Sequence, residues 1–428
     1  MTEKMKPSGI AWIGDVPQSW NISRLKYNIT CLDEQRIPVD AALRNPGPYP
    51  YWGAGSIVDY VDNYIFDEEL VLLGEDGAPF FDEYRPVAFL ITEKIWANNH
   101  IHVIKGKQGV CNRFLVHYLN SVEYREYING SILNKLTQGN MNEIVCPIPS
   151  AVEQEIIADF LDAQCAKIDS VIADIEKQIE TLQKYKKSLI TEAVTKGLDR
   201  SVPMKDSGIV WIGNVPEHWN LKRLKFMLEN SSDSMKVGPF GSALSGGDFT
   251  DEGKWVYNQR VVLDKNFSEN ATFISEEKYR EMQGFSVYPG DILITTRGTI
   301  GKVAIVPEGA QEGILHPCII KFRVDKEMMM PELLELIFNE SDFVKDQFTL
   351  MSNATTIEVI YSYSLKDIIL PVIPAEEQKK IYSYLSEKCT TIDAVIMEKQ
   401  KALSAITQHK KSLIYEYVTG KKRVTEVN

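Results

Sequence analysis

Features that would point to several common protein classes are missing from this sequence. Its six cysteines form no C-x-x-C pair, which argues against a zinc site or a disulfide framework and favours reduced, mostly buried thiols. No apolar run reaches the roughly 18 residues needed to span a bilayer, and residues 1–7 have no apolar segment of the signal-peptide kind. We therefore expect a cytoplasmic protein without a metal or a membrane partner.

Motifs for catalysis are also lacking. Residues 296–303 resemble a phosphate-binding loop, but Thr296 replaces its first glycine and Val303 its Ser/Thr, so we predict a turn between strands. His100 and His102 would share one face of a strand, and we expect no carboxylate or Cys ligand near them, which favours ordinary polar contacts over metal binding. No Asn-Pro-Pro-Tyr motif of an amino-methyltransferase is present. A stand-alone nuclease or methyltransferase is therefore the less favoured alternative, and we expect a chain that is not itself an enzyme.

Positive charge is scarce. The chain has 47 Lys and Arg against 59 Asp and Glu, a formal net charge of −12. Isolated DNA-binding domains are usually basic, because phosphate contacts supply most of their affinity. Either DNA is not the partner, or the basic residues are clustered, or another subunit supplies them.

The sequence does contain a long internal repeat. Residues 6–26 match 205–225 at 14 of 21 positions, both with the pattern W-I-G-x-V-P-x-x-W. Residues 153–195 match 377–419 at 18 of 43 positions, both beginning Glu-Gln and containing Lys-Lys-Ser-Leu-Ile. The blocks between them, 27–146 and 226–370, show little identity. The repeated elements therefore form two like frameworks, and each carries one of two dissimilar globular blocks, called heads below.

The second repeated element predicts two long helices with heptad spacing. Gly197 is a predicted C-cap, and Ser150 with Glu153 has capping-box spacing. The predicted seam residues are Ile168, Ile172, Ile175, Ile179, Leu182, Leu189, Ile392, Ile396, Leu403, Ile406 and Leu413.

Helices of this length cannot bury their apolar stripes against one small domain each. We therefore predict that they pair as an antiparallel coiled coil, with two separate core helices as the alternative. Antiparallel pairing would bring the end of the second helix near the N-terminal Trp segment and make the chain pseudo-twofold.

The blocks read as mixed α/β (α+β), with short strands near 70–73, 87–91, 291–295 and 302–306. The predicted fold is therefore two globular heads and two long antiparallel helices. The predicted divisions are 1–149, 150–198, 199–373 and 374–428.

Polar and aromatic loop residues are the candidates for reading DNA. Arg, Asn and Gln can contact base edges, while Lys and Ser can anchor phosphates. In the first block the candidates are Tyr51, Trp52, Ser56, Asn98, Asn99, Gln138 and Asn140. In the second they are Lys236, Ser242, Asn258, Gln259, Arg260, Arg297, Lys302, Asn353 and Thr355.

The order of these elements resembles the specificity subunits of type I restriction-modification systems, over essentially the whole chain. The Glu-Gln helix starts carry the resemblance most strongly, with residues 238–242 and 290–302 resembling the family's target-recognition domains. The first block departs from the family at Gly74-Glu75-Asp76-Gly77, where a more basic turn is expected.

The resemblance implies a function. Each head would read one half of an asymmetric bipartite site in double-stranded DNA, and the helices would set the spacer between the halves. Two modification subunits would dock along the helices, bind S-adenosylmethionine and methylate adenine, and a restriction subunit could join them. These partners could also supply the missing positive charge. A coiled-coil adaptor that binds no DNA is the alternative.

Overall fold

The computed structural model describes residues 4–82, 84–128, 134–240, 243–269, 272–352 and 359–424. The chain divides into two compact units. Unit 1 comprises residues 1–177 and 399–428, and unit 2 comprises 178–398. Each long helix contributes one part to each unit.

Unit 1 contains the first block as a set of small sheets. Its strands are β1 (Met5–Pro7), β2 (Asp15–Pro17), β3 (Asn21–Arg24), β4 (Ile29–Cys31), β5 (Pro46–Trp52), β6 (Ile57–Val61), β7 (Leu70–Gly74), β8 (Ala88–Ile91), β9 (Trp96–Ala97), β10 (Ile101–Gly106) and β11 (Val145–Ile148). Its short helices are α1 (Leu25–Asn28), α2 (Asn112–Leu119) and α3 (Gln138–Glu143).

Unit 2 contains the second block. Its strands are β12 (Met204–Asp206), β13 (Asn214–Pro216), β14 (Asn220–Arg223), β15 (Met235–Val237), β16 (Phe249–Thr250), β17 (Lys254–Tyr257), β18 (Thr272–Ile274), β19 (Ser286–Val287), β20 (Ile292–Thr295), β21 (Val303–Ile305), β22 (Gly313–Leu315), β23 (Ile319–Phe322) and β24 (Ile369–Val372). Its short helices are α5 (Gln259–Asp264), α6 (Glu276–Glu281), α7 (Pro331–Glu340), α8 (Phe343–Ser352) and α9 (Ser362–Asp367).

The two blocks share one framework despite their unlike sequences. The four-stranded sheet of unit 1 has the order β4-β10-β7-β8, and its counterpart in unit 2 has the order β15-β23-β20-β21. All neighbours in both sheets are antiparallel. Each unit also has one parallel pair in the same place, β5 with β9 and β17 with β22. The two heads are therefore unlike in side chains and alike in topology.

The two long helices are α4 (Ala151–Lys196) and α10 (Ala375–Val418). In unit 1 Lys410 donates to both carboxylate oxygens of Asp169 at 2.6 and 2.8 Å, and Arg423, just beyond α10, pairs with Glu153 at 3.2 Å. As the residue number of the contact increases along one helix, the number of its partner on the other decreases. The helices are therefore antiparallel, which confirms the prediction.

In unit 2 Lys186 makes the same contact with Asp393, at 2.8 and 2.7 Å. These two residues are the repeat equivalents of Lys410 and Asp169, so both units pair the helices in one register. All eleven predicted seam residues are buried or half-buried. Lys186, in the skipped heptad position, is buried among them.

The repeated Trp segment packs on the helix ends. In unit 1 Tyr415 of α10 donates from its hydroxyl to the carbonyl oxygen of Trp12 at 2.9 Å, and Gly420 lies against the ring of Trp20. In unit 2 the position of a Cβ on Gly197 lies 3.4 Å from Trp219. Gly197 has the left-handed φ of 75° expected of a C-cap. In each unit the repeated Trp segment therefore covers the C-terminal end of one long helix.

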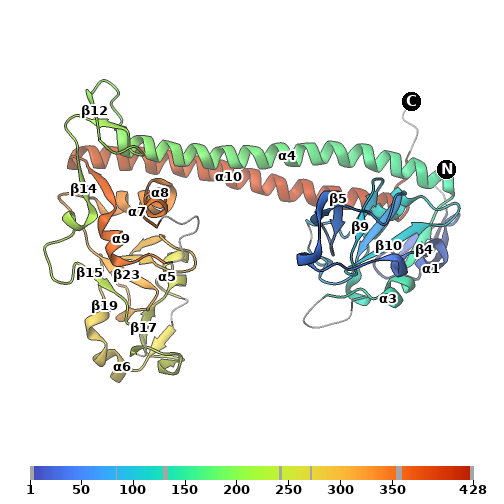
Figure 1. Cartoon of the computed structure of the whole chain (residues 1–428), viewed down its shortest axis with the longest axis horizontal. Coiled ribbons are helices and arrows are strands. Elements are labelled where there is room, and N and C mark those ends of the chain that lie inside the picture. Colours follow the sequence, from blue (N-terminus) through green and yellow to red (C-terminus); the bar gives the residue numbers. More distant parts are fainter. Residues whose placement is uncertain are drawn as a thin grey trace. The chain divides into compact units, whose positions relative to one another are not determined.

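The core of unit 2 joins the head to the helices. Its largest apolar cluster combines residues of the β20 and β23 strands, of α7 and α8, and of α4 and α10. Helices α7 and α8 lie between the sheet and the long helices (Figure 1). Among the helices of the described ranges, none has an apolar stretch long enough to cross a membrane.

Candidate nucleic-acid interface

Two turns occupy equivalent places in the shared framework. One follows β7 at residues 74–77 and the other follows β20 at residues 295–298. Each contains a glycine in the left-handed region, Gly77 at φ 77° and Gly298 at φ 66°. Each is bridged to the segment that leads into a short helix, Asp76 to Lys135 and Arg297 to Val359. The same scaffold therefore presents an acidic turn in unit 1 and a basic one in unit 2.

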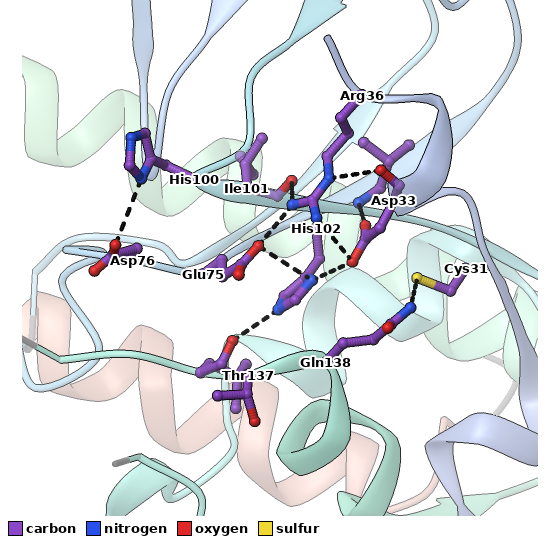
Figure 2. Close-up of polar contacts among 12 residues, drawn as sticks. Cys31, Asp33, Arg36, Glu75, Asp76, His100, Ile101, His102, Thr137 and Gln138 are labelled. Atoms are coloured by element: carbon purple, nitrogen blue, oxygen red, sulfur yellow. Dashed lines mark hydrogen bonds and ion pairs between the residues drawn. The ribbon is translucent and has the colours of Figure 1, made fainter. Parts of the chain in front are cut away.

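The acidic turn is held by a network of ion pairs (Figure 2). The guanidinium of Arg36 donates to Glu75 at 2.6 Å. Nδ1 of the buried His102 lies 2.6 Å from Asp33, and its Nε2 lies 2.8 Å from the carbonyl oxygen of Leu136. A carboxylate and a carbonyl both accept, so this arrangement favours an imidazolium that donates from both nitrogens.

The charge state of Asp33 agrees with this arrangement. Burial alone would raise its pKa, but the hydrogen bond and the charge of His102, a backbone N–H and the charge of Arg36 outweigh burial and lower the pKa below its ordinary value. Asp33 is therefore a carboxylate at neutral pH, and Arg36 and His102 hold it and Glu75 beneath the turn.

The expectation that no carboxylate lies near His102 was wrong. One ligand atom each from Asp33, Glu75 and His102 lie within 4.8 Å of one another, as in a metal site. However, the carboxylate of Glu75 already accepts a hydrogen bond from Arg36, and both ring nitrogens of His102 lie beside hydrogen-bond acceptors. A metal would have to displace these partners, so the geometry favours an ion-pair cluster.

The basic turn is held by different means. The buried Thr296 donates from its hydroxyl to the carbonyl oxygen of Cys318 at 2.9 Å, while the Arg297 side chain is exposed. The chain then returns as β21, antiparallel to β20. Residues 296–303 thus form a turn and the start of a strand, as predicted, and not a phosphate-binding loop leading into a helix.

Three predicted reading residues in unit 1 are buried. Tyr51 is 1% exposed and its hydroxyl accepts from the N–H of Val39; Trp52 is 8% exposed and packs on Phe89. Asn98 is also 8% exposed, and its side-chain oxygen accepts a hydrogen bond from the backbone N–H of His100. These side chains shape the β5–β9 region from within, so we withdraw them as candidates for DNA contact.

The other candidates of unit 1 are accessible. Gln138 and Asn140 lie on α3, close after the Asp76–Lys135 bridge, and Gln138 donates to the Cys31 sulfur at 3.0 Å. Ser56 and Asn99 are exposed in loops at the ends of β5 and β9. The structure therefore places two of the four beside the acidic turn.

The candidates of unit 2 are also divided. Arg297 lies on the basic turn, and Lys302 lies just before β21. Gln259 contacts the segment between them by donating to the carbonyl oxygen of Thr299 at 3.3 Å. Asn258 caps α5 and Arg260 pairs with Asp264, so both are structurally engaged. Lys236 lies on β15, with its ammonium 5.2 Å from the ring centre of Phe285. Ser242, Asn353 and Thr355 lie outside the described residues.

Comparison with known proteins identifies the family. The model of the type I restriction modification DNA specificity domain matches residues 17–181 and again 237–404, well over half of the chain. The chain belongs to this family. The two matches follow the two halves of the internal repeat.

Related specificity subunits match over most of their length. A putative type I restriction enzyme specificity subunit of Haemophilus influenzae is 28% identical over 377 residues, covering 85% of this chain and 86% of that protein. The MjaVIII specificity subunit of Methanocaldococcus jannaschii is 24% identical over 435 residues, covering 96% and 95%. A solved chain from a study of type I R-M system assembly superposes with a TM-score of 0.65 at 14% identity, covering 95% and 99%, which shows a shared fold.

The Glu-Gln motif of this specificity-domain chain has a structural role in both units. The amide of Gln154 accepts from Cys111 N–H at 2.8 Å and donates to the carbonyl oxygens of Gly109 and Pro149. Gln378 makes the equivalent three bonds, to Met330, Met328 and Ile373. Each glutamine thus ties the start of a long helix to its head.

Sequence reasoning missed two tyrosines beside the basic turn. Tyr361 and Tyr363 follow the bridge at Val359, are 53% and 65% exposed, and stack with ring centroids 5.4 Å apart. Exposed aromatic pairs are suited to contacts with sugars and bases. Tyr361 is the N-cap residue of α9 and Tyr363 lies in its first turn, so the close Tyr-Ser-Tyr spacing was the available signal.

Proposed function

We propose that this chain is the DNA sequence-specificity subunit of a type I restriction-modification complex. Each head reads one half of an asymmetric bipartite site, and the paired helices set the unread spacer. In this proposal the chain is not catalytic, works in the cytosol, and leaves methyl transfer to its partners.

The observation that carries the proposal is the repeated framework with unlike turns. A carboxylate turn can accept hydrogen bonds from the amino groups of cytosine or adenine, whereas an arginine turn favours the acceptor edge of guanine. Two such turns on one scaffold suit a site whose halves differ in sequence. Membership of the specificity-domain family supports the same function.

The partners follow from the same proposal. Two modification subunits dock on the repeated helices, because only the repeated parts offer two like surfaces. They carry S-adenosylmethionine and hold the target adenine outside the duplex during transfer. They also supply phosphate-binding charge that a chain of net charge −12 lacks. A restriction subunit can join this core for cleavage.

Methylome sequencing tests the proposal directly. A host is given this chain with its neighbouring methyltransferase, each alone, or neither. We expect a split, asymmetric N6-methyladenine motif only when both are present. A verified complex that methylates no new motif would contradict the proposal and favour the coiled-coil adaptor.

A further inference from the structure

A cavity of about 340 Å³ lies beside the basic turn of unit 2. Thr299, Gly301 and Lys302, which connect the basic turn to β21, form one wall. Lys187 of α4 and Lys345 of α8 contribute to the others. Three lysines from three separate elements thus line one hollow in an acidic chain, together with one carboxylate, that of Asp342, and several apolar side chains.

The charges of these lysines are unequally balanced. Lys187 is paired with Asp342 at 3.0 Å. The ammonium of Lys302 donates to the carbonyl oxygen of Asn339 at 2.6 Å. Within the described ranges, no carboxylate lies within ion-pair distance of Lys302 or Lys345. The hollow therefore retains positive charge that the protein does not neutralise there.

The pKa of Lys302 is lowered by burial and by the positive charges around it. Burial is the main cause that lowers its pKa. The positive charges of Lys187, Lys265 and Lys345 lower it further, and only Glu340 opposes them. Glu340 is itself 2.7 Å from Lys186. An anion in the cavity would offset this repulsion.

Unit 1 has a hollow in the equivalent place, of about 300 Å³. Asn120 there bonds the backbone at Ala88 on β8, as Asn339 bonds Val303 on β21. The position of Lys302 is taken by Val87, and acidic residues join the basic ones in the lining. The framework thus provides the hollow and, with Lys411 and Lys187, one lysine in each unit, whereas Lys302 and Lys345 line the hollow of unit 2.

We propose that this lysine-lined cavity holds a backbone phosphate of the DNA at the half-site read by unit 2. The inference rests on the proposed function and adds a positioning site to it. Lys345 and Lys302 are the contacting residues, and Thr299 offers a hydroxyl. A phosphate clamped here sets the register of the duplex against the turn that carries Arg297, without reading a base itself.

The test uses the complete complex with its modification subunits and a duplex containing the methylated motif. Lys345→Gln should weaken binding about eightfold near 0.1 M salt and reduce the slope of log K against log salt by about 0.9, the effect of one lost phosphate contact. The methylated motif should not change. The matched control is Lys326→Gln, an exposed lysine of unit 2 that does not line this cavity.

Neutral methylphosphonate linkages then locate the phosphate. One linkage at the half-site of unit 2 should weaken the wild-type complex and have no further effect on the Lys345→Gln complex. Lys345→Arg should restore binding. If Lys345→Gln and Lys326→Gln bind alike while the motif is still methylated, the cavity proposal fails and the specificity function stands. If no motif is methylated at all, both fail.

Discussion

At the residue scale, the two turns balance their charges in opposite ways. Glu75 and Asp33 are held beneath one turn by Arg36 and His102, so the carboxylates are fixed in place and largely neutralised. Arg297 in the other turn is exposed to solvent. One turn thus lies over buried, paired carboxylates, and the other exposes a cation to solvent.

Replacing His102 by Gln should destabilise unit 1 by about 1–3 kcal/mol, because the buried Asp33 loses its 2.6 Å contact with His102 and keeps only the more distant Arg36, at 3.4 Å. Since the pKa of Asp33 is lowered on folding, its stabilising contribution is present above the unfolded value of 3.8 and is lost as pH falls through the folded pKa. Urea unfolding of the two proteins between pH 7 and pH 3 measures both effects.

The control for this substitution is His100→Gln. The His100 side chain is 49% exposed and lies 3.6 Å from Asp76, so its loss should cost less than about 1 kcal/mol. Equal losses for the two variants would show that the buried network does not stabilise the turn.

At the element scale, polar residues interrupt the apolar seam of the long helices in symmetric positions. Lys186 is buried and bonds Asp393 and Glu340, and Lys410 bonds Asp169. A buried charge pair adds little net stability but disfavours other registers. We interpret the two pairs as devices that specify how α4 and α10 align within each unit.

Lys186→Met should leave the free energy of unfolding within about 1 kcal/mol of wild type, because the half-exposed carboxylates can return to water and the new side chain packs in the seam. Lys186→Asp should cost several times more, about 3–5 kcal/mol, by placing a third carboxylate there. Thermal unfolding compares them. Burial lowers the Lys186 pKa, but Asp393 and Glu340 raise it overall. The contribution of the ion pair is therefore fully present below the unfolded pKa of 10.5 and is lost as pH rises through the higher folded pKa.

The proposed function makes helix length the determinant of the spacer. Inserting one heptad into both helices preserves the seam and adds about 10 Å of helix. Methylome sequencing should then report the same two half-sites with a longer spacer. An unchanged spacer would rule out the helices as the measuring element.

At the scale of the whole molecule, one framework is used twice with different side chains. The sheets β4-β10-β7-β8 and β15-β23-β20-β21 are topologically the same, while the residues that they present differ. The side chains of one head can thus change while its attachment to the long helices is kept. The repeated Trp segments and the glutamines of the Glu-Gln motif provide that attachment.

Exchanging residues 27–146 for the corresponding block of another family member should therefore change one half-site only. The half-site read by unit 2 and the spacer should be retained, since unit 2 and the helices are untouched. Methylated motifs of the parent and the chimaera provide the comparison. A change in both halves would refute independent reading by the heads.

The sequence by itself determined the repeat, the two long helices and the seam, because these are local patterns with a regular period. It also determined that residues 296–303 form a turn, since that follows from residues adjacent in the chain. The antiparallel pairing followed from the length of the stripe, which no small head could bury.

Tertiary structure alone decided which residues meet around the turns. Asp33 and His102 are 69 positions apart, and they meet because β10 pairs with both β4 and β7. The same long-range pairing buried Tyr51 and showed that the two dissimilar blocks have one topology. No local pattern encodes such contacts, because strand order is chosen by the packing of the whole core.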